Sequence, residues 1–208
     1  MAEKTYHRDN LKSQLIEEGL KLLDREGYEE FSLRKVAKAC NVSHTAPYRH
    51  FKNKDELIAA IGQEINRKFS NALLESVHQY PDDPKAQLKE MGYSYIKFFS
   101  ENPEYLRLIF LSDIKQQMMK SLQISEECPI FNDENSNNPF RILSDAVTRY
   151  KTEIQDDTAS SVDQDALTLY CWGLVHGIAI LIARKDFPYQ GDTLELVRKI
   201  MWNHSVLK

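Results

Sequence analysis

The 208-residue chain has few glycines and few cysteines, and each shortage excludes a class of protein. Its seven glycines form no Gly-rich phosphate loop, and no stretch alternates polar and apolar residues between turn signals. Neither a nucleotide-binding loop nor a hairpin-rich β fold is therefore predicted. No N-terminal segment combines a basic start, an apolar run and a small-residue cleavage site, so a cytoplasmic location is expected. Apolar residues recur at helical spacing instead, which predicts an all-α protein.

The cysteines are widely spaced, and none belongs to a Cys-x-x-Cys pair. Cys40, Cys128 and Cys171 are therefore expected to be reduced thiols. A redox-sensing role is one interpretation of Cys128, but the adjacent Glu126 and Glu127 oppose thiolate formation and favour an ordinary loop cysteine. No His-x-x-x-His pair is present either, so neither a metal site nor a cofactor is predicted.

The net charge of −4 is unevenly distributed along the chain. Residues 1–54 contain 11 Lys and Arg against 8 Asp and Glu, whereas residues 55–208 contain 16 against 23. A basic end can attract phosphates while an acidic body limits indiscriminate association. The small excess is weak evidence alone, but it favours a nucleic-acid partner for the N-terminal part.

Residues 31–54 are the most informative stretch, because they predict two short helices around a tight turn. Ser32 stands at an N-cap position before apolar residues at helical spacing, and this helix is expected to end near Cys40. Asn41 tolerates the left-handed backbone conformation that a sharp turn requires. Ser43 is then expected to cap the second helix.

The second helix has little to bury. Its anchors are Val42 before it and Phe51 after it, and Pro47 is placed in its first turn, where a missing N–H costs least. A helix this short is marginal alone, so packing must hold it. A polar helix held out in this way suits insertion into the roughly 12 Å wide major groove of DNA. Its polar or amphipathic residues are His44, Thr45, Tyr48 and Arg49.

Apolar positions on either side predict a supporting helix and a long connecting helix. The supporting helix carries an apolar stripe from Leu11 to Leu23 and is expected to end at Gly27. Residues 53–56 resemble a capping box, which would open a helix with one apolar face up to Leu73. Two downstream signals, Asp83-Pro84 and Asn102-Pro103, each place a polar cap before proline and predict further helix starts.

The segment 169–183 is apolar on all sides, yet it is shorter than the roughly 20 residues that a membrane span needs. No membrane contact is predicted, and we expect this helix to be buried by its own subunit and by a second subunit. A last helix should pack beside it, with Leu194, Val197, Ile200 and Met201 on one face. The longest predicted loop is residues 125–139.

The stretch from about Leu15 to Leu57 resembles the N-terminal domain of the TetR family of bacterial transcriptional regulators. Two positions depart from the family pattern: Cys40-Asn41 stands where Ala-Gly is usual, and Gly19 stands where alanine is commoner. Neither departure breaks the predicted turn. The matching residues are Gly19-Leu20, Leu22-Leu23, Gly27-Tyr28, Phe31-Ser32-Leu33, Val36-Ala37, Val42-Ser43, Tyr48-Arg49-His50-Phe51 and Lys54-Asp55-Glu56-Leu57.

Residues 172–177, Trp-Gly-Leu-Val-His-Gly, are similar to the Trp-His-Gly (WHG) signature of one C-terminal domain class of the same family. Phe98-Phe99, Asn102-Pro103 and residues 105–110 are similar to that class as well. The class implies a homodimer built by the last two long helices around an effector pocket. The expected fold is therefore all-α, with a three-helix helix-turn-helix domain at residues 1–54. A long helix joins it to a larger helical effector-binding and dimerisation domain at residues 55–208.

The resemblance also implies the site residues. His44 and Thr45 would meet base edges, and Ser43, Tyr48, His50 and Lys54 would meet phosphates, with Ser32 and Arg34 completing the predicted interface. For Tyr48 and His50 the competing interpretation is packing against the first short helix. The candidate effector pocket consists of Phe99, Phe110, Met118, Tyr170, Trp172 and His176. Plain core is the competing interpretation for these residues, and for His176 a core histidine bonded to a carbonyl.

The implied function is that of a dimeric, sequence-specific DNA-binding regulator. It would be a repressor, released from an inverted-repeat operator in double-stranded DNA by a small-molecule effector. Two other classes stay open from the residues alone, a helical protein-interaction module and a small-molecule enzyme. The enzyme has little support, since no nucleophile sits in a strand-to-helix elbow. Salt-dependent DNA affinity would separate the regulator from both.

Overall fold

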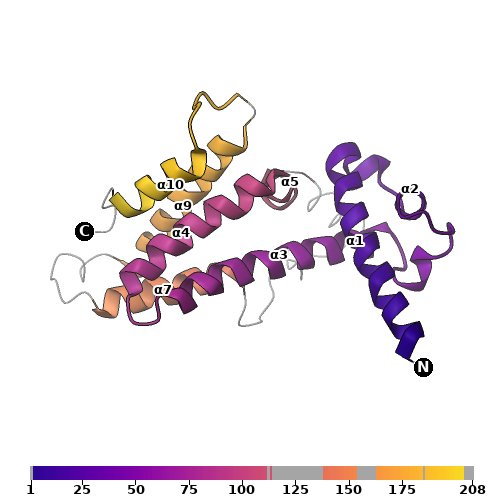
Figure 1. Cartoon of the computed structure of the whole chain (residues 1–208), viewed down its shortest axis with the longest axis horizontal. Helices are drawn as coiled ribbons and strands as arrows, with labels where there is room; N and C mark the ends of the chain where they lie inside the picture. The colour runs from indigo at the N-terminus through magenta and orange to yellow at the C-terminus, as the bar shows by residue number, and fades with distance from the viewer. Residues whose placement is uncertain (1, 112, 114–137, 154–162, 185, 204–208) are drawn as a thin grey trace. The chain divides into compact units, whose positions relative to one another are not determined.

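The computed structural model describes residues 2–111, 113, 138–153, 163–184 and 186–203. All regular structure in these residues is helical, as predicted (Figure 1). The chain divides into two compact units. The N-terminal unit holds residues 2–65 and the described residues from 104 to 113, and the C-terminal unit holds residues 66–103 and the described residues from 138 onwards.

The N-terminal unit begins with α1, Ala2–Glu30, which is interrupted at Gly27 (φ 76°, ψ 178°). This confirms that the regular helix ends at Gly27, where a positive φ favours glycine. Gly19 also has a structural reason: a Cβ there would lie 3.1 Å from Cδ1 of Ile61 and 3.4 Å from Cδ2 of Leu57. The missing side chain therefore permits a close approach of α1 to the start of α3, Lys54–Gln79.

Helix α2, Leu33–Ala39, begins and ends as its sequence predicts. The Ser32 hydroxyl oxygen accepts the backbone N–H of Lys35 at 3.3 Å, so Ser32 is the N-cap. At the other end Asn41 has a φ of 54°, and the N–H of Val42 donates to the carbonyl of Ala37 at 3.0 Å. This left-handed residue reverses the chain after α2.

The second short helix differs from the prediction. Ser43 does not cap it: its hydroxyl shares a hydrogen bond with the Thr45 hydroxyl (3.2 Å), and the regular helix η1, a single 3-10 turn, spans only Pro47–Arg49. The physical reason is the position of Pro47, four residues after Ser43. There an α-helix needs an N–H to donate to the Ser43 carbonyl, and proline has none. The backbone makes three-residue hydrogen bonds instead, including Ala46 N–H to Ser43 O at 2.9 Å.

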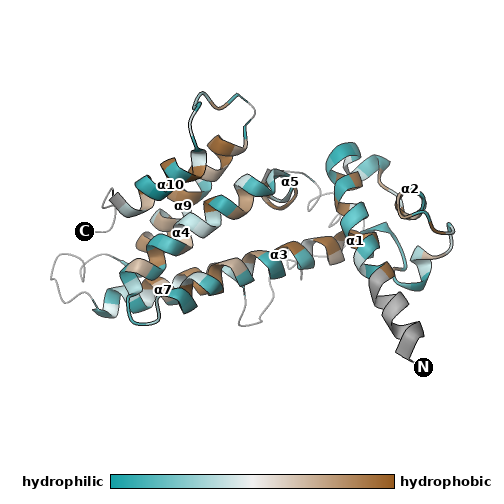
Figure 2. Ribbon diagram, in the orientation of Figure 1, coloured by the Kyte–Doolittle hydropathy of each residue, from teal (hydrophilic) through white to brown (hydrophobic). Residues whose placement is uncertain are grey.

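In the C-terminal unit, α4 (Pro84–Glu101) is the helix against which α7 (Pro139–Glu153), α9 (Gln164–Ala183) and α10 (Thr193–Asn203) pack. Apolar and polar residues alternate along α3 and α4 as they do on helices with one buried face (Figure 2). The predicted start of α4 is confirmed, with Pro84 as its first residue and Asp83 accepting the N–H of Ala86 at 2.8 Å.

Gly92 marks the place where two helices meet α4. A Cβ on Gly92 would lie 2.8 Å from Sδ of Met201 on α10 and 3.3 Å from Cγ1 of Val175 on α9. Glycine is therefore required here for both helices to lie this close to α4. The predicted face of the last helix is confirmed at Val197 and Met201, which are buried, and α10 packs against α4.

Within the described residues of a single chain, helix α9 is covered on one face only. Its buried residues are Thr168, Val175 and Ala179, whereas Leu169 and Leu181 remain 68% and 53% exposed. Burial on all sides, expected from the sequence, is thus not achieved by the described part of one chain. By length and composition α9 is also the one described helix apolar enough to cross a membrane, a test that interface and core helices pass too.

A short helix, α5 (Pro103–Leu106), follows α4 at the predicted Asn102-Pro103 start and continues into a π-helical turn, η2 (Arg107–Leu111). From Glu104 onwards this segment belongs to the N-terminal unit. Arg107 fastens it to α1 through two bonds to the Asp24 carboxylate, at 2.9 and 2.8 Å. The predicted loop at 125–139, including Cys128, lies almost entirely outside the described residues.

Candidate nucleic-acid interface

Residues 43–50, here called the recognition segment, present polar side chains outward from an apolar anchor. Pro47 is buried, and Phe51, which follows the segment, is only 3% exposed. Between these anchors Tyr48 is 58% exposed. The N–H of Phe51 donates to the carbonyl of Pro47 at 2.9 Å, so the two anchors also hold the backbone of the turn. Ser43, His44 and Thr45 are exposed on the same segment.

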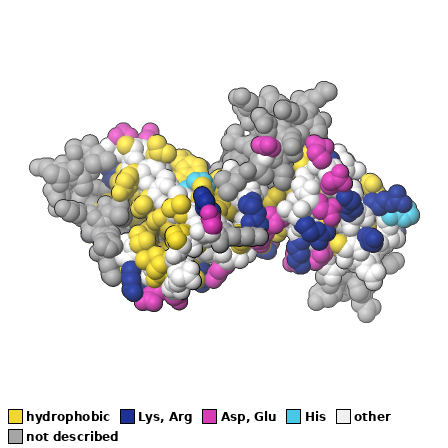
Figure 3. Space-filling model, turned by 90° about the horizontal axis from the view of Figure 1, so that it is seen from above, with side chains coloured by type: hydrophobic (Ala, Val, Ile, Leu, Met, Phe, Trp, Pro, Cys, Tyr) yellow, Lys and Arg dark blue, Asp and Glu magenta, His cyan; other side chains and the backbone are white. Residues whose placement is uncertain are grey.

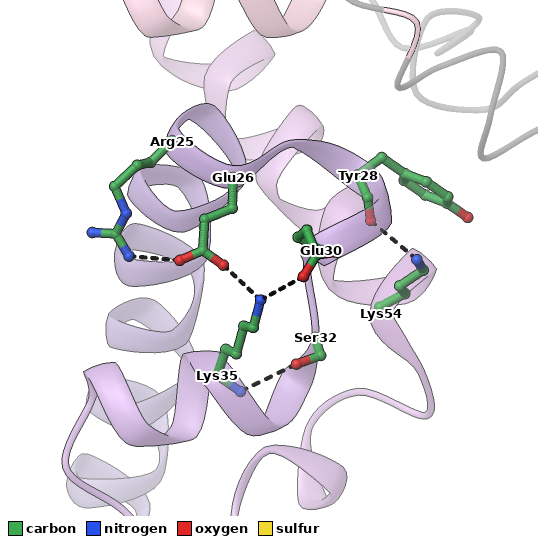
Figure 4. Close-up of polar contacts among 7 residues, drawn as sticks. All are labelled: Arg25, Glu26, Tyr28, Glu30, Ser32, Lys35 and Lys54. Atoms are coloured by element: carbon green, nitrogen blue, oxygen red, sulfur yellow. Dashed lines mark hydrogen bonds and ion pairs between the residues drawn. The ribbon is translucent and has the colours of Figure 1, made fainter.

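The end of α1 is tied to the start of α3, which follows the recognition segment in the sequence. The Tyr28 hydroxyl donates to Asp55 at 2.7 Å, in a buried contact. The Lys54 ammonium donates to the Tyr28 carbonyl at 3.1 Å (Figure 4) and lies 3.9 Å from the centre of the Tyr28 ring. Lys54 therefore has a structural partner that the sequence did not reveal. An ammonium has three donors, so two remain for a phosphate.

A second polar cluster joins α1 to α2. The Lys35 ammonium lies between Glu26 and Glu30, at 2.9 and 3.2 Å, and Arg25 also contacts Glu26 at 2.9 Å (Figure 4). The hydrogen bond from Lys35, followed by that from Arg25, lowers the pKa of Glu26, and Glu26 in turn raises the pKa of Lys35. Lys35 is thereby neutralised by its own helix pair.

Four other cations of this region have exposed side chains that, within the described residues, form no ion pair and no hydrogen bond of their own: Arg34, Lys38, Arg49 and Lys52. Figure 3 shows Lys and Arg side chains over the N-terminal unit with acidic ones among them. Only Arg34 of the four was predicted as a site residue. The missed signal was simple, since Arg49 and Lys52 lie within or just beyond the stretch already singled out by its polar residues.

All eight predicted DNA-binding residues lie in this unit, on α2, on the recognition segment or at the start of α3. Ser32 caps α2, and Arg34 is exposed in its first turn. His50 is half-buried, with its ring 6.4 Å from that of Phe51, so packing accounts for part of its role. Tyr48 is too exposed for packing alone.

Comparison with known proteins identifies this unit. Residues 15–61 match the family described as bacterial regulatory proteins, tetR family. Over these residues the helix-turn-helix domain is similar to that of the TetR family. The match ends at Ile61, so the WHG class of the C-terminal part of this chain stays a prediction.

Relatives of this chain are named as transcriptional regulators. It is 30% identical over 92 residues to the HTH-type transcriptional regulator AcrR of Shigella flexneri, covering 44% of this chain and 43% of that one. It is 31% identical over 109 residues to an uncharacterized HTH-type transcriptional regulator of Haemophilus influenzae, covering 52% and 55%. The chain thus spans about half the length of these curated relatives.

Similarity of fold extends over nearly the whole chain. A TetR family transcription regulator from Marinobacter aquaeolei VT8 superposes with a TM-score of 0.68, at 18% identity, over 98% of this chain and 97% of that one. At this identity the match establishes the fold alone. It agrees with a helix-turn-helix domain followed by a larger helical domain.

The predicted pocket residues do not all lie together: three of them surround Tyr95 in the C-terminal unit, and the others lie elsewhere. Phe99 is fully buried, with its ring 4.8 Å from that of Phe69 and 5.1 Å from that of Tyr95. Trp172 and His176 are half-buried on α9 and meet the same tyrosine. Tyr170, by contrast, is 52% exposed. Phe110 lies on η2 in the N-terminal unit, and Met118 lies outside the described residues.

Tyr95 is the residue that organises this region, and sequence reasoning missed it. Its hydroxyl lies 2.8 Å from Nδ1 of His176, and the Trp172 indole acts on its pKa in the direction opposite to burial. Burial raises the pKa of Tyr95 and lowers that of His176, so both are neutral near pH 7. The hydroxyl and the neutral imidazole therefore share a hydrogen bond whose direction depends on the tautomer of His176. Nδ1 of His176 thus has a tyrosine hydroxyl as its hydrogen-bond partner.

The remaining groups offer no metal or redox chemistry within the described residues. No cluster of three or more His, Cys, Asp or Glu side chains there is placed to hold a metal ion. Burial raises the pKa of Cys171 to about 11 and also raises that of Cys40. Both thiols are therefore protonated at neutral pH and poorly nucleophilic.

Proposed function

We propose that this chain is a dimeric, sequence-specific DNA-binding regulator that represses genes until a small molecule releases it from an inverted-repeat operator. The observation that carries the proposal is the recognition segment, an exposed polar turn pinned by buried Pro47 and Phe51. It lies in a helix-turn-helix domain of the TetR family and is flanked by cations without acidic partners. Such a segment can enter the major groove while the flanking cations meet phosphates.

In this proposal His44 and Thr45 contact base edges, since they stand exposed at the start of the recognition segment. Phosphates are met by residues around them. Ser32 can take this role because its hydroxyl oxygen accepts the hydrogen bond from the Lys35 N–H. The hydroxyl proton can then be donated to a phosphate oxygen of the DNA. The phosphate-contacting set is Ser32, Arg34, Ser43, Tyr48, His50 and Lys54.

The second subunit would cover the open face of α9. Leu169, Gly173, Gly177 and Leu181 follow one another at four-residue spacing along this helix. A Cβ on Gly173 or Gly177 would meet nothing within 4 Å, so a helix from a second copy has room to approach closely. Figure 3 shows hydrophobic side chains gathered on one face of the C-terminal unit. The exposed residues of α10 are charged, namely Glu195, Arg198 and Lys199, so α9 would supply the apolar centre.

A second copy of this chain is the partner that an inverted-repeat operator favours for the open face of α9. A two-fold dimer presents the same segment twice, to half-sites about one helical turn, or 34–36 Å, apart. An effector bound in the C-terminal domain would favour a dimer with another spacing. A coupling of roughly 1–3 kcal/mol between effector and DNA is ordinary for such a switch.

The proposal is tested by selecting the purified protein against a random duplex DNA library at low and high salt, with sequencing of the retained molecules. Enrichment of an inverted repeat is expected, and light scattering should give the mass of two chains. Enrichment of single half-sites would contradict the dimeric arrangement. Complete absence of DNA binding at every salt concentration would favour the interaction module or the enzyme.

A further inference from the structure

Arg49 is one of the four exposed cations around the recognition segment whose side chains have no ion pair within the described residues, although the N-terminal unit pairs several other cations. Lys21 contacts Glu18 at 2.7 Å, Arg107 contacts Asp24 at 2.8 Å, and Lys35 contacts two carboxylates. Arg49, within the described residues, has no such contact and is exposed. Its charge is thus available to a partner outside the chain.

The backbone under Arg49 is firmly placed. Arg49 is the last residue of η1, and its N–H donates to the carbonyl of Ala46 at 3.2 Å. Buried anchors lie on both sides of it, two residues before at Pro47 and two residues after at Phe51. A side chain that discriminates between bases must project from such a rigid support, because an error of 1 Å breaks paired hydrogen bonds.

The chemistry of the exposed side chains in the recognition segment distinguishes Arg49 from its neighbours. Serine, threonine and tyrosine each offer one hydroxyl, and a histidine ring cannot present two parallel donors. A guanidinium presents two parallel N–H groups, which match O6 and N7 of guanine in the major groove. Arg49 is the only residue of the segment able to make this bidentate contact.

We infer that Arg49 reads a guanine in each half-site of the operator, an inference that rests on the proposed function. Lys52, three residues further along, is the matched contrast. It is also exposed and unpaired within the described residues, but an ammonium is a point charge on a flexible stem. Lys52 therefore contacts phosphate and adds affinity without base preference.

The experiment is the duplex library selection carried out in parallel with the wild type, Arg49→Ala, Arg49→Lys and Lys52→Ala. The wild type should select a guanine at one fixed position of each half-site. Arg49→Ala should lose that guanine alone, with the other positions unchanged. Arg49→Lys keeps the charge but not the two parallel N–H groups, and it should also select the guanine poorly. Lys52→Ala should select the wild-type sequence with lower affinity.

A second measurement uses the selected operator with 7-deazaguanine at that position, which removes the N7 acceptor. Loss of the guanine contact should weaken the wild type by roughly 5- to 150-fold and leave Arg49→Ala nearly unaffected. Circular dichroism spectra should show that all variants are folded, since both side chains are exposed.

Two outcomes would overturn the inference and are distinguishable. If Arg49→Ala selects the same bases as the wild type with uniformly lower affinity, Arg49 contacts phosphate and the inference alone fails. If the wild type selects no sequence at all, the proposed function fails together with it.

Discussion

The recognition segment and helix α9 have opposite polarity. The segment is polar outside and is pinned by apolar residues, Pro47 and Phe51, on its inner side. Helix α9 is apolar outside, at Leu169 and Leu181, while its inner side carries a polar contact from His176 to Tyr95. The exposed surface of the recognition segment suits a charged, hydrated partner, and the exposed face of α9 suits an apolar partner. The two surfaces therefore differ in the chemistry of the partner that each could bind.

The largest effect is expected from placing a charge on the open face of α9. Leu181→Lys would bury an unpaired ammonium in the proposed dimer interface, and an effect of roughly 30-fold or more on dimer dissociation is expected. Analytical ultracentrifugation over a concentration series measures it. Lys199→Ala, which removes an exposed pair with Glu195 on α10, is the control and should change little. An unchanged dimer with Leu181→Lys would place the interface elsewhere.

A glycine-to-alanine pair tests the packed face of α9 against its open face. Gly92→Ala puts a Cβ against Met201 and Val175 and should lower the free energy of unfolding by about 1–3 kcal/mol. Gly173→Ala meets nothing within 4 Å and should leave it unchanged or raise it by up to about 1 kcal/mol. Urea unfolding in the Leu181→Lys background keeps dimerisation out of the comparison. Equal effects of the two substitutions would contradict the one-sided packing of α9.

Removal of a phosphate contact should have a smaller effect, visible in the salt dependence of binding. Lys54→Ala is expected to weaken binding to all sequences alike and to lower the slope of log affinity against log salt by about 1. Lys97→Ala removes an equal charge from α4, which belongs to the C-terminal unit, and should leave the slope unchanged. If Lys54→Ala also leaves the slope unchanged, the residue serves only its contacts with Tyr28.

The smallest effect concerns the polar side of α9. Burial lowers the pKa of His176 below its ordinary value of 6.5, so the unfolded chain binds a proton more readily than the folded one. The stabilisation is complete above about pH 6.5 and is lost as the pH falls through the lower folded pKa. Urea unfolding between pH 5 and 8 should show this loss. His176→Gln keeps an acceptor for Tyr95 and should remove that part of the pH dependence, and an identical pH profile for the variant would contradict the assignment.

Local signals in the sequence predicted much of the fold. Ser32, Asn41, Gly27 and Pro84 act through the backbone within a few residues of themselves, and the structure has each in its expected role. The polar pattern of the recognition segment predicts a full helix, but it does not take into account that Pro47 lies four residues after Ser43. That error was local too, since proline at the fourth position removes the first helical hydrogen bond.

Long-range pairings could not be read from the sequence. Nothing in the order of residues indicates that Tyr95 meets His176, that Lys54 meets Tyr28, or that Tyr170 turns away from the residues around Tyr95. The predicted pocket therefore contained side chains that the structure assigns to different surroundings. Helical spacing predicts which residues share a face, but not what covers that face.

Caps, turns and motifs depend on neighbours along the chain, so the order of residues was enough to predict most of the helices, the turn after α2 and the similarity of residues 15–61 to the TetR family. The tertiary structure alone decided which cations remain unpaired and which face of α9 stays open. It also decided which groups surround Tyr95. Ion pairing and burial depend on residues far apart in sequence, and only the packing of α4 with its neighbours and of α1 with α2 brings those residues together.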